Sequence, residues 1–171
     1  MNTDKITLGS GSLWLNGVDV GALKGVVTFT YSVDKVPFKP ATIKGDTNIF
    51  RIKENAQLEA SLAELKVDNL KLALGVGTSV GTNTGTSFGL TNRRQITFGG
   101  EGKQETMALR FEHTRADGKK VLVVFYKAYS DTELALPFDE ENVTLFPLLF
   151  KALSDPDRDE DDRMGVLIEE L

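Results

Sequence analysis

The clearest pattern along the chain is a strict alternation of apolar and polar residues over "IFRIKENAQLEASL", residues 49–62. The apolar residues share one parity, interrupted only by Glu54, and the polar residues share the other. This period of two predicts a β-strand with one buried and one polar face. At roughly 3.3 Å per residue the strand would reach about 45 Å, which is more than twice the usual strand length.

Shorter alternating segments predict further strands on both sides of this one. Asn16-Gly17 between two short apolar runs predicts a type I′ hairpin, and "GVVTFTYSV" predicts a strand over 25–33. Downstream, "RQITFGG", "ETMALRFEH", "KKVLVVFYKAY" and "VTLFPLLFKAL" predict four more strands. We expect Pro147 to restrict the last of these to a sheet edge or a bulge.

A short helix is predicted directly after the long strand. Val67, Leu70 and Leu74 have helical spacing, and Gly75 suits the position after the last turn.

Two segments predict loops without secondary structure. Pro37 and Pro40 interrupt residues 34–48 and exclude pairing within a central strand. Residues 76–89 are rich in Gly, Thr and Ser, which favours a second loop.

These patterns together predict a mainly β, antiparallel fold: a β-sandwich or partial barrel of about seven to nine strands with one short flanking α-helix. The 171 residues, 40% of them hydrophobic, suffice for one core. We assign residues 1–154 to a single β domain and 155–163 to an acidic loop. The segment 164–171 is expected to dock on the same domain, because the apolar "MGVLI" follows a charged run.

The net charge of −5 is concentrated at the C-terminus. From Asp155 onward there are eight acidic and two basic residues, which leaves 17 acidic and 18 basic residues in 1–154. Neither part has the basic patch that binding to nucleic acid requires. We expect the run "DPDRDEDDR", residues 155–163, to be mobile and at the outer surface.

No motif for catalysis or for a metal site stands out. The only histidine, His113, has no nucleophile motif beside it, and the chain has no Cys. Asp155, Asp157 and Asp159 have the spacing of an EF-hand loop, but Glu160 occupies the position that requires Gly. We therefore expect no enzymatic activity, no cofactor and no metal.

Membrane insertion is not expected either. No stretch approaches ~20 apolar residues, and the N-terminus lacks the apolar centre of a signal peptide. We expect a protein that folds in the cytoplasm.

A long strand with a polar face fits a sheet that continues beyond one subunit. Joined edge to edge with further copies, such a sheet would form a large barrel with a wet interior and no unpaired edges.

In the order and character of its elements, the chain resembles the tail tube (major tail) proteins of long-tailed bacteriophages. The resemblance covers about Gly9 to Leu153 and rests on "GSLWLNGVDVGAL", "GVVTFTYSV", the proline-broken segment, the long alternating strand, "VDNLKLALG", "ALRFEHTRADGKKVLVVFYKA" and "TLFPLLFKALSD". It implies a β-sandwich that assembles into stacked hexameric rings, a hollow tube in the virion built in the bacterial host cytoplasm. The implied partners are further copies of the chain, a tape-measure protein, and tail-tip and tail-terminator proteins. Double-stranded DNA would pass through the tube without specific binding.

Such a channel must not hold a polyanion. On this basis the lumen-facing residues are those of the polar parity in the second half of the long strand: Asn55, Gln57, Glu59 and Ser61. Arg51 and Lys53 have the same parity and do not suit a DNA channel. They either pair with acidic residues across strands or face a partner ring.

The resemblance also implies that the loop leading into the long strand reaches neighbouring subunits and the next ring. We expect this loop, residues 34–48, to be mobile in the monomer and Phe38 to be its apolar anchor. The predicted inter-ring contact residues are Lys35, Phe38, Lys39, Ile43 and Lys44.

The alternative from another class is a monomeric β-sandwich module that binds carbohydrate or a cell surface. Trp14, the only tryptophan, lies beside the Asn16-Gly17 turn, where it would either form a sugar-stacking platform or cover one end of the core.

Overall fold

Antiparallel β-strands dominate the fold, which confirms the predicted mainly β, antiparallel fold class. The computed structural model describes residues 11–38, 48–63, 67–75, 80–83, 89–90, 93–96, 104–133, 135 and 145–171. The strands are β1 (Ser12–Leu15), β2 (Val18–Asp19), β3 (Thr28–Phe38), β4 (Asn48–Leu62), β5 (Val80–Asn83), β6 (Arg93–Ile96), β7 (Met107–Thr114), β8 (Lys120–Ser130), β9 (Phe146–Ala152) and β10 (Gly165–Glu169). Helix α1 spans Val67–Leu74.

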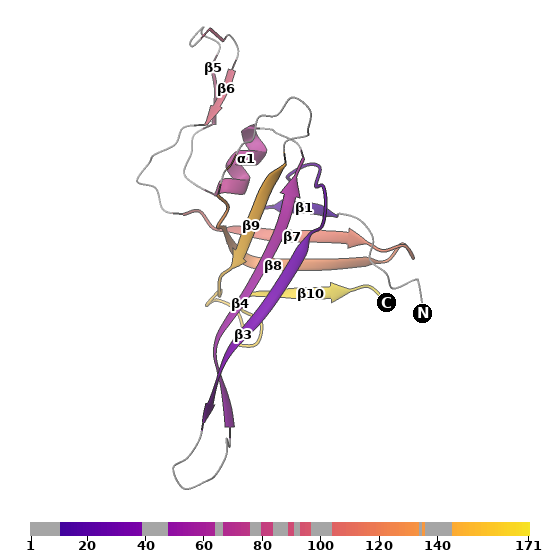
Figure 1. Cartoon of the computed structure of the whole chain (residues 1–171), viewed down its shortest axis with the longest axis vertical. Helices are drawn as coiled ribbons and strands as arrows, with labels where there is room; N and C mark the ends of the chain where they lie inside the picture. Colours follow the sequence, from indigo (N-terminus) through magenta and orange to yellow (C-terminus); the bar gives the residue numbers. More distant parts are fainter. Residues whose placement is uncertain are drawn as a thin grey trace.

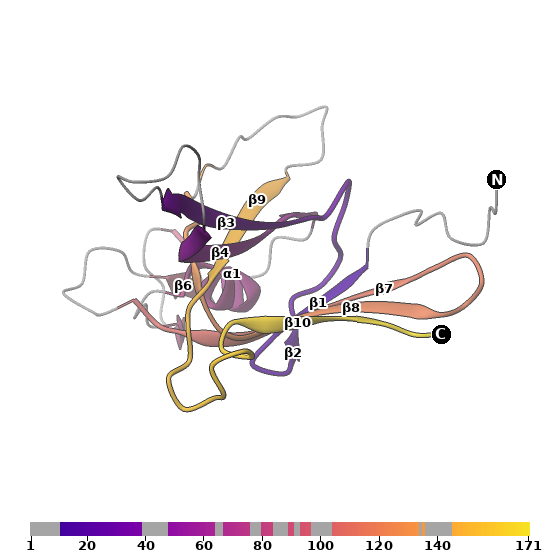
Figure 2. The ribbon, with the colours of Figure 1, turned by 90° about the horizontal axis from the view of Figure 1, so that it is seen from below.

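Eight of these strands form one sheet that folds into two layers. Its order is β2-β1-β7-β8-β9-β4-β3, with β10 paired to β8. Strand β8 joins the layers, because its first half pairs with β10 and its last residues pair with β9. Figure 2 shows β3, β4 and β9 in one layer and β1, β7 and β10 in the other, and Figure 1 shows their strands crossing. The described strands do not close into a barrel.

The hydrophobic core lies between the two layers. It is formed by side chains of β1, β4, β7, β8 and β9, whose largest fully buried members are Leu13, Leu15, Leu58, Leu62, Leu109, Phe125, Phe146 and Phe150. The alternation in β4 produces this packing only between Ala56 and Leu62, where every second residue is buried.

The predicted hairpin at Asn16-Gly17 is present between β1 and β2. Both turn residues have positive φ, 51° for Asn16 and 78° for Gly17, as a type I′ turn requires. The Asn16 side chain also accepts a hydrogen bond from the Ala108 backbone N–H at 2.9 Å, which ties the turn to β7.

Helix α1 forms where its spacing predicts it, and its Ala73 side chain belongs to the core. An ion pair between Asp68 and Arg94 links the helix to β6. The prediction of a loop over 76–89 is wrong in part, because Val80–Asn83 forms β5 and pairs with β6. The β-prone Val and Thr residues of this segment find a partner strand that local composition does not reveal.

The prediction of a loop over 34–48 is also wrong where the structure describes this segment. Strand β3 continues to Phe38, and β4 begins at Asn48. Pro37 is accommodated because β3 lies at the end of the sheet order, where a missing N–H need not break a ladder. Pro147 likewise lies in the part of β9 that pairs with β4 alone. Residues 39–47 lie outside the described residues.

Candidate functional site

The predicted lumen-facing residues lie on one face of β4. Asn55, Gln57 and Ser61 are half-buried and Glu59 is exposed, and they alternate with the core residues of the same strand. Gln57 donates a hydrogen bond from Nε2 to Oε1 of Glu59 at 3.0 Å. The structure therefore brings the four residues together on one polar surface.

This polar surface extends to both neighbouring strands. In β3, the register places Thr28, Thr30 and Ser32 opposite Glu59, Gln57 and Asn55. In β9, Lys151 lies opposite Gln57, whereas the apolar Leu149 and Pro147 lie opposite Glu59 and Ser61, so the surface is polar in β9 only at Lys151. Lys151 forms an ion pair with Asp131, and the hydrogen bond to this carboxylate raises the pKa of the Lys151 ammonium.

A register shift changes the faces of the long hairpin beyond this surface. Asp34 pairs with Lys53, but Lys35 pairs with Arg51, so Ile52 is an extra residue in β4. The bulge reverses the two faces over the rest of β4, residues 48–51. Phe50 and the opposite Val36 therefore lie on the same face as Asn55 rather than on the core face. The prediction that Phe50, Ile52 and Leu58 share one buried face is therefore wrong.

The same bulge separates the two basic residues of the predicted polar face. Arg51 lies on the core side, where it forms an ion pair with Glu54 at 2.9 Å and donates a hydrogen bond to the Tyr31 hydroxyl at 2.9 Å. Burial raises the pKa of Tyr31, and the hydrogen bond with Glu54 adds to this. Lys53 lies opposite Asp34 in the ladder. Each base therefore has an acidic residue beside it.

The end of the hairpin beyond Asn55 stands clear of the two layers, as Figure 1 shows. We call residues 34–38 and 48–54 the arm. Apolar side chains lie on both of its faces, with exposed fractions of 65% for Ile49 and Ile52 and 56% for Phe50. Phe38 and Phe50 form an edge-to-face pair with ring centroids 6.0 Å apart. Two of the predicted contact residues, Lys35 and Phe38, lie in this arm and are exposed, whereas Lys39, Ile43 and Lys44 lie outside the described residues.

The core is open between β3 and β10, a feature that the sequence does not reveal. Phe29 and Tyr31 pair with the buried Leu58 and Ala56, and Leu167 pairs with the buried Val123, so all three face the core side. They are nonetheless 36%, 48% and 58% exposed. Together with Val123, Phe125, Met164 and Val166 they line an apolar groove of about 70 Å³.

The acidic run forms a closed loop beside this groove. The Asp155 N–H donates to the Arg163 carbonyl at 2.8 Å and closes the loop. Arg158 forms an ion pair with Asp162 at 2.7 Å, and its guanidinium lies 3.5 Å from the ring centroid of Tyr126. The Tyr126 hydroxyl donates to Asp162 at 2.8 Å. The run is therefore exposed, as predicted, but its own contacts hold it in place rather than leaving it a mobile tether.

A larger cleft separates the acidic loop from the base of the arm. Its volume is about 1020 Å³. The sides are polar and carry both signs of charge, from Lys53 and Glu54 on the arm, Lys151 on β9, and Glu160, Asp161 and Arg163 on the loop.

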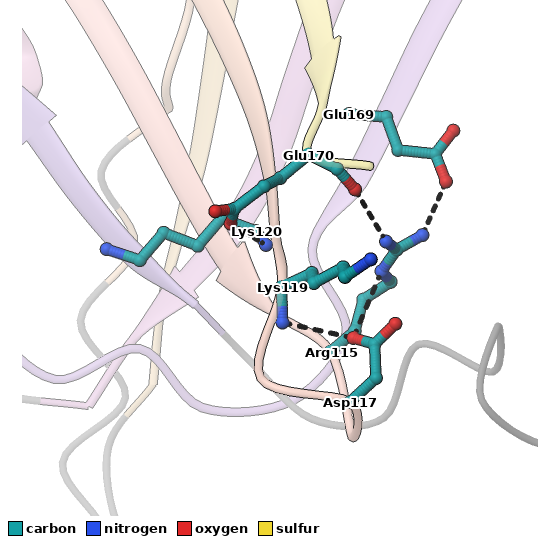
Figure 3. A network of polar contacts seen from close by, with 6 residues as sticks. All are labelled: Arg115, Asp117, Lys119, Lys120, Glu169 and Glu170. Carbon is teal, nitrogen blue, oxygen red and sulfur yellow. Dashed lines mark hydrogen bonds and ion pairs between the residues drawn. The ribbon is translucent and has the colours of Figure 1, made fainter.

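The C-terminal segment returns to the sheet as β10 and is held by a buried cation. Arg115, whose side chain is only 7% exposed, donates to Glu169 at 2.5 Å and to the Glu170 carbonyl at 2.9 Å. Lys120 and Glu170 exchange further hydrogen bonds through the Lys120 backbone. Figure 3 shows these contacts gathered at the turn between β7 and β8.

His113 and Trp14 were considered above for catalysis and for sugar stacking, respectively. His113 is buried at the end of β7, and its Nε2 has no hydrogen-bond partner among the described residues. Trp14 is half-buried and lies outside the core cluster, so it does not cover one end of the core. The Arg110 guanidinium lies over the Trp14 ring, 5.2 Å from its centroid.

Within the described ranges, no three His, Cys, Asp or Glu side chains are grouped as a metal site would require. The described helix is too short and too polar to cross a membrane. The chain matches none of the protein-family models compared with it, and no curated protein matches it.

Proposed function

We propose that the chain is a structural subunit of a phage tail tube, which polymerises as stacked hexameric rings around a channel for DNA delivery. Its partners are then further copies of itself, a tape-measure protein, and tail-tip and tail-terminator proteins, with DNA passing transiently. The observation that carries the proposal is the arm. Its apolar side chains are exposed on both faces, which is unfavourable for a monomer in water and typical of an interaction surface.

The polar surface of β3, β4 and β9 supports the same proposal. It presents hydroxyl and amide groups of β3 and β4, one acidic residue at position 59, and Lys151 of β9, which is already paired with Asp131. The apolar Leu149 and Pro147 of β9 complete this face. A surface of this kind has few cationic groups that would bind the phosphates of DNA. We assign Asn55, Gln57, Glu59 and Ser61 to the wall of the channel.

Negative-stain electron microscopy of the purified protein tests this function. We expect rings or tubes at high concentration or in the presence of a tail-tip initiator. In Phe50→Ser these polymers should be lost. The free energy of unfolding of the monomer should fall by only about 0.5–1.5 kcal/mol, because the side chain is exposed and loses its edge-to-face contact with Phe38. Monomers that never assemble and that bind glycans would contradict the proposal and favour a carbohydrate-binding module.

A further inference from the structure

Strand β10 is an edge strand with one unpaired side. It is the outermost strand of its layer (Figure 1), and among the described residues it pairs with β8 alone. The Glu170 N–H donates to the Lys120 carbonyl of β8, which fixes the alternation of the ladder. The N–H and C=O groups of Gly165, Leu167 and Glu169 therefore point away from β8. β10 presents them as an open row of donors and acceptors.

The side chains of β10 are apolar on both faces of the sheet. Leu167 faces the core side and is 58% exposed, whereas Val166 and Ile168 lie on the outer face and are 36% and 45% exposed. On that outer face they lie opposite Val124 and Leu122 of β8. Apolar residues on both faces are typical of a strand inside a covered sheet rather than of an edge. β10 thus suits a position with a neighbouring strand on each side.

We propose that two copies of the free chain pair through β10, antiparallel about a two-fold axis beside Leu167. With Leu167 opposite Leu167 of the second copy, Gly165 lies opposite Glu169 and Val166 lies opposite Ile168. This register joins the free N–H and C=O groups of both strands and sets no like charges opposite each other. Sliding the strands further would set Leu167 against Glu169, and then Glu169 against itself.

A second β10 matches this edge better than the other end strands of the sheet do. The core-side row of Phe111, Val123 and Leu167 would continue into the same row of the second copy and extend the floor of the apolar groove. In contrast, β3 carries Thr28 and Thr30 on its outer face, where β10 is apolar. Strand β2 has only two residues. The best partner for β10 is therefore its own copy.

The β10 contact closes after two copies. A two-fold interface uses the same surface on both partners, whereas a hexameric ring needs two different surfaces that meet head to tail. The contact is therefore distinct from the ring contacts of the proposed function and does not depend on that function. It gives the free subunit a dimeric state outside any polymer.

Cross-linking of two single-cysteine chains tests the register, because the chain has no Cys of its own. Val166→Cys and Ile168→Cys chains, one of them carrying a size tag, should form covalent heterodimers when they are mixed and oxidised. Opposite residues of this kind have Cα atoms about 4.5 Å apart, within the range that a disulfide bridges. Either chain oxidised alone should give about fivefold less dimer, because its two cysteines are then diagonal and about 7–8 Å apart.

The matched control for this cross-link mixes Val18→Cys with Ile168→Cys. Val18 is similarly exposed, at 49%, but lies in β2 at the opposite end of the layer. This mixture should form no more heterodimer than either chain alone. Equal yields from the mixed and the separate chains of positions 166 and 168, or the absence of any cross-link, would overturn the proposed pairing.

Sedimentation of the chain without cysteines measures the pairing itself. We expect a monomer–dimer equilibrium at concentrations below those that give polymers. Leu167→Lys should raise its dissociation constant at least about tenfold, because two ammonium groups would lie directly opposite each other. Val18→Lys is the control and should dimerise like the parent, and circular dichroism should show both variants folded. A monomeric parent, or a Leu167→Lys chain that dimerises like the parent, would refute the pairing.

Electron microscopy separates this inference from the proposed function. A Leu167→Lys chain that no longer dimerises and still forms tubes supports the inference. If this variant loses tubes together with dimers, β10 is a contact within the ring, and the closed two-fold contact is overturned. A parent chain that dimerises through β10 but never forms tubes supports the pairing and contradicts the tube function.

Discussion

At the scale of single residues, Arg115 connects the C-terminal strand to the rest of the sheet. Its charge is buried, and its two terminal nitrogens bind Glu169 and the Glu170 carbonyl, while Nε lies 3.5 Å from the Asp117 carboxylate. Removal of the guanidinium would leave the Glu169 carboxylate and the Glu170 carbonyl without these hydrogen-bond donors at the end of β10.

We therefore predict that Arg115→Ala lowers the free energy of unfolding by about 1.5–3 kcal/mol. Urea denaturation measures this loss, and amide exchange of β10 should rise more than that of β9. Lys119→Ala is the control, because this neighbouring side chain is exposed, and it should change stability by less than about 0.5 kcal/mol. An unchanged denaturation midpoint in Arg115→Ala would show that β8 pairing alone holds the strand.

The acidic loop should respond to pH through Asp162. The hydrogen bond from Arg158, and then that from Tyr126, lowers the pKa of this carboxyl below its ordinary value. The folded loop therefore favours the ionised form, and this stabilisation is fully present above about pH 3.9, the ordinary Asp pKa. It is lost as the pH falls further, through the lowered pKa.

We predict that the protection factors of the amides across residues 155–163, which are corrected for the intrinsic pH dependence of exchange, fall in acid in the parent chain. In Asp162→Asn these protection factors should already be low near neutral pH and should lose most of this acid dependence. Asp157→Asn, an exposed change in the same loop, is the control and should behave like the parent. Equal pH profiles for the parent and Asp162→Asn would refute the role of this carboxylate.

At the scale of elements, the bulge at Ile52 decides where the arm points. An extra residue in one strand increases the local twist and bends the ribbon. Deletion of Ile52 would leave the pairs Lys53 with Asp34 and Arg51 with Lys35 in place while it removes the bend. We expect the monomer to keep its stability, because residues 48–54 lie outside the core, and we expect polymer yield to fall.

Ile52→Ala is the matched control for this deletion. It shortens an exposed side chain and keeps the bulge, so polymer yield should decrease less than in the deletion variant. Thermal melting and electron microscopy measure the two properties separately. Normal tubes from the deletion variant would show that the direction of the arm does not matter for assembly.

How much of these elements the sequence predicts depends on whether their cause is local. The Asn16-Gly17 turn, helix α1 and the buried half of β4 follow from conformational preference and periodicity within a few residues. The bulge does not, because Ile52 fits the alternation and only the pairing with β3 shows that it is extra. The strand over 34–38 was hidden for a similar reason, since Pro37 excludes a central strand but not an edge strand.

In the candidate site, too, only the features with a local cause can be predicted from the sequence. The polar surface of β4 follows from alternation, whereas the groove between β3 and β10 depends on how far the two layers overlap. Phe29, Tyr31 and Leu167 have the pattern of core residues, and no sequence signal indicates that a third of each side chain or more stays exposed.

At the scale of the whole molecule, the chain has a polar surface on one layer and apolar surfaces at its open edge and on the arm. In the proposed tube, the chain would be stable alone through its two-layer core and would bury more apolar surface against further copies. The apolar surfaces would then be covered, and the polar surface of β3, β4 and β9 would remain in contact with water. We therefore expect changes on the polar surface to alter transport through the channel rather than assembly.

The last prediction tests that expectation at Glu59, the exposed acidic residue at the centre of the polar surface. Glu59→Lys should change the free energy of unfolding by less than about 0.5 kcal/mol, because the side chain is exposed and the interaction it loses is a surface hydrogen bond from Gln57. In a hexameric ring, the substitution would exchange an acidic residue for a basic one at every copy and so place rings of positive charge along the path of the phosphates. Since each added cation contact strengthens binding to DNA, we expect DNA release from virions to slow and to recover at higher salt.

Glu59→Gln is the control, which removes the negative charge without adding a positive one and should release DNA at nearly the parent rate. Tube yield by electron microscopy should be equal in all three proteins. Parent-like release by Glu59→Lys virions with normal tubes would place Glu59 outside the channel, and with it the polar surface of β4.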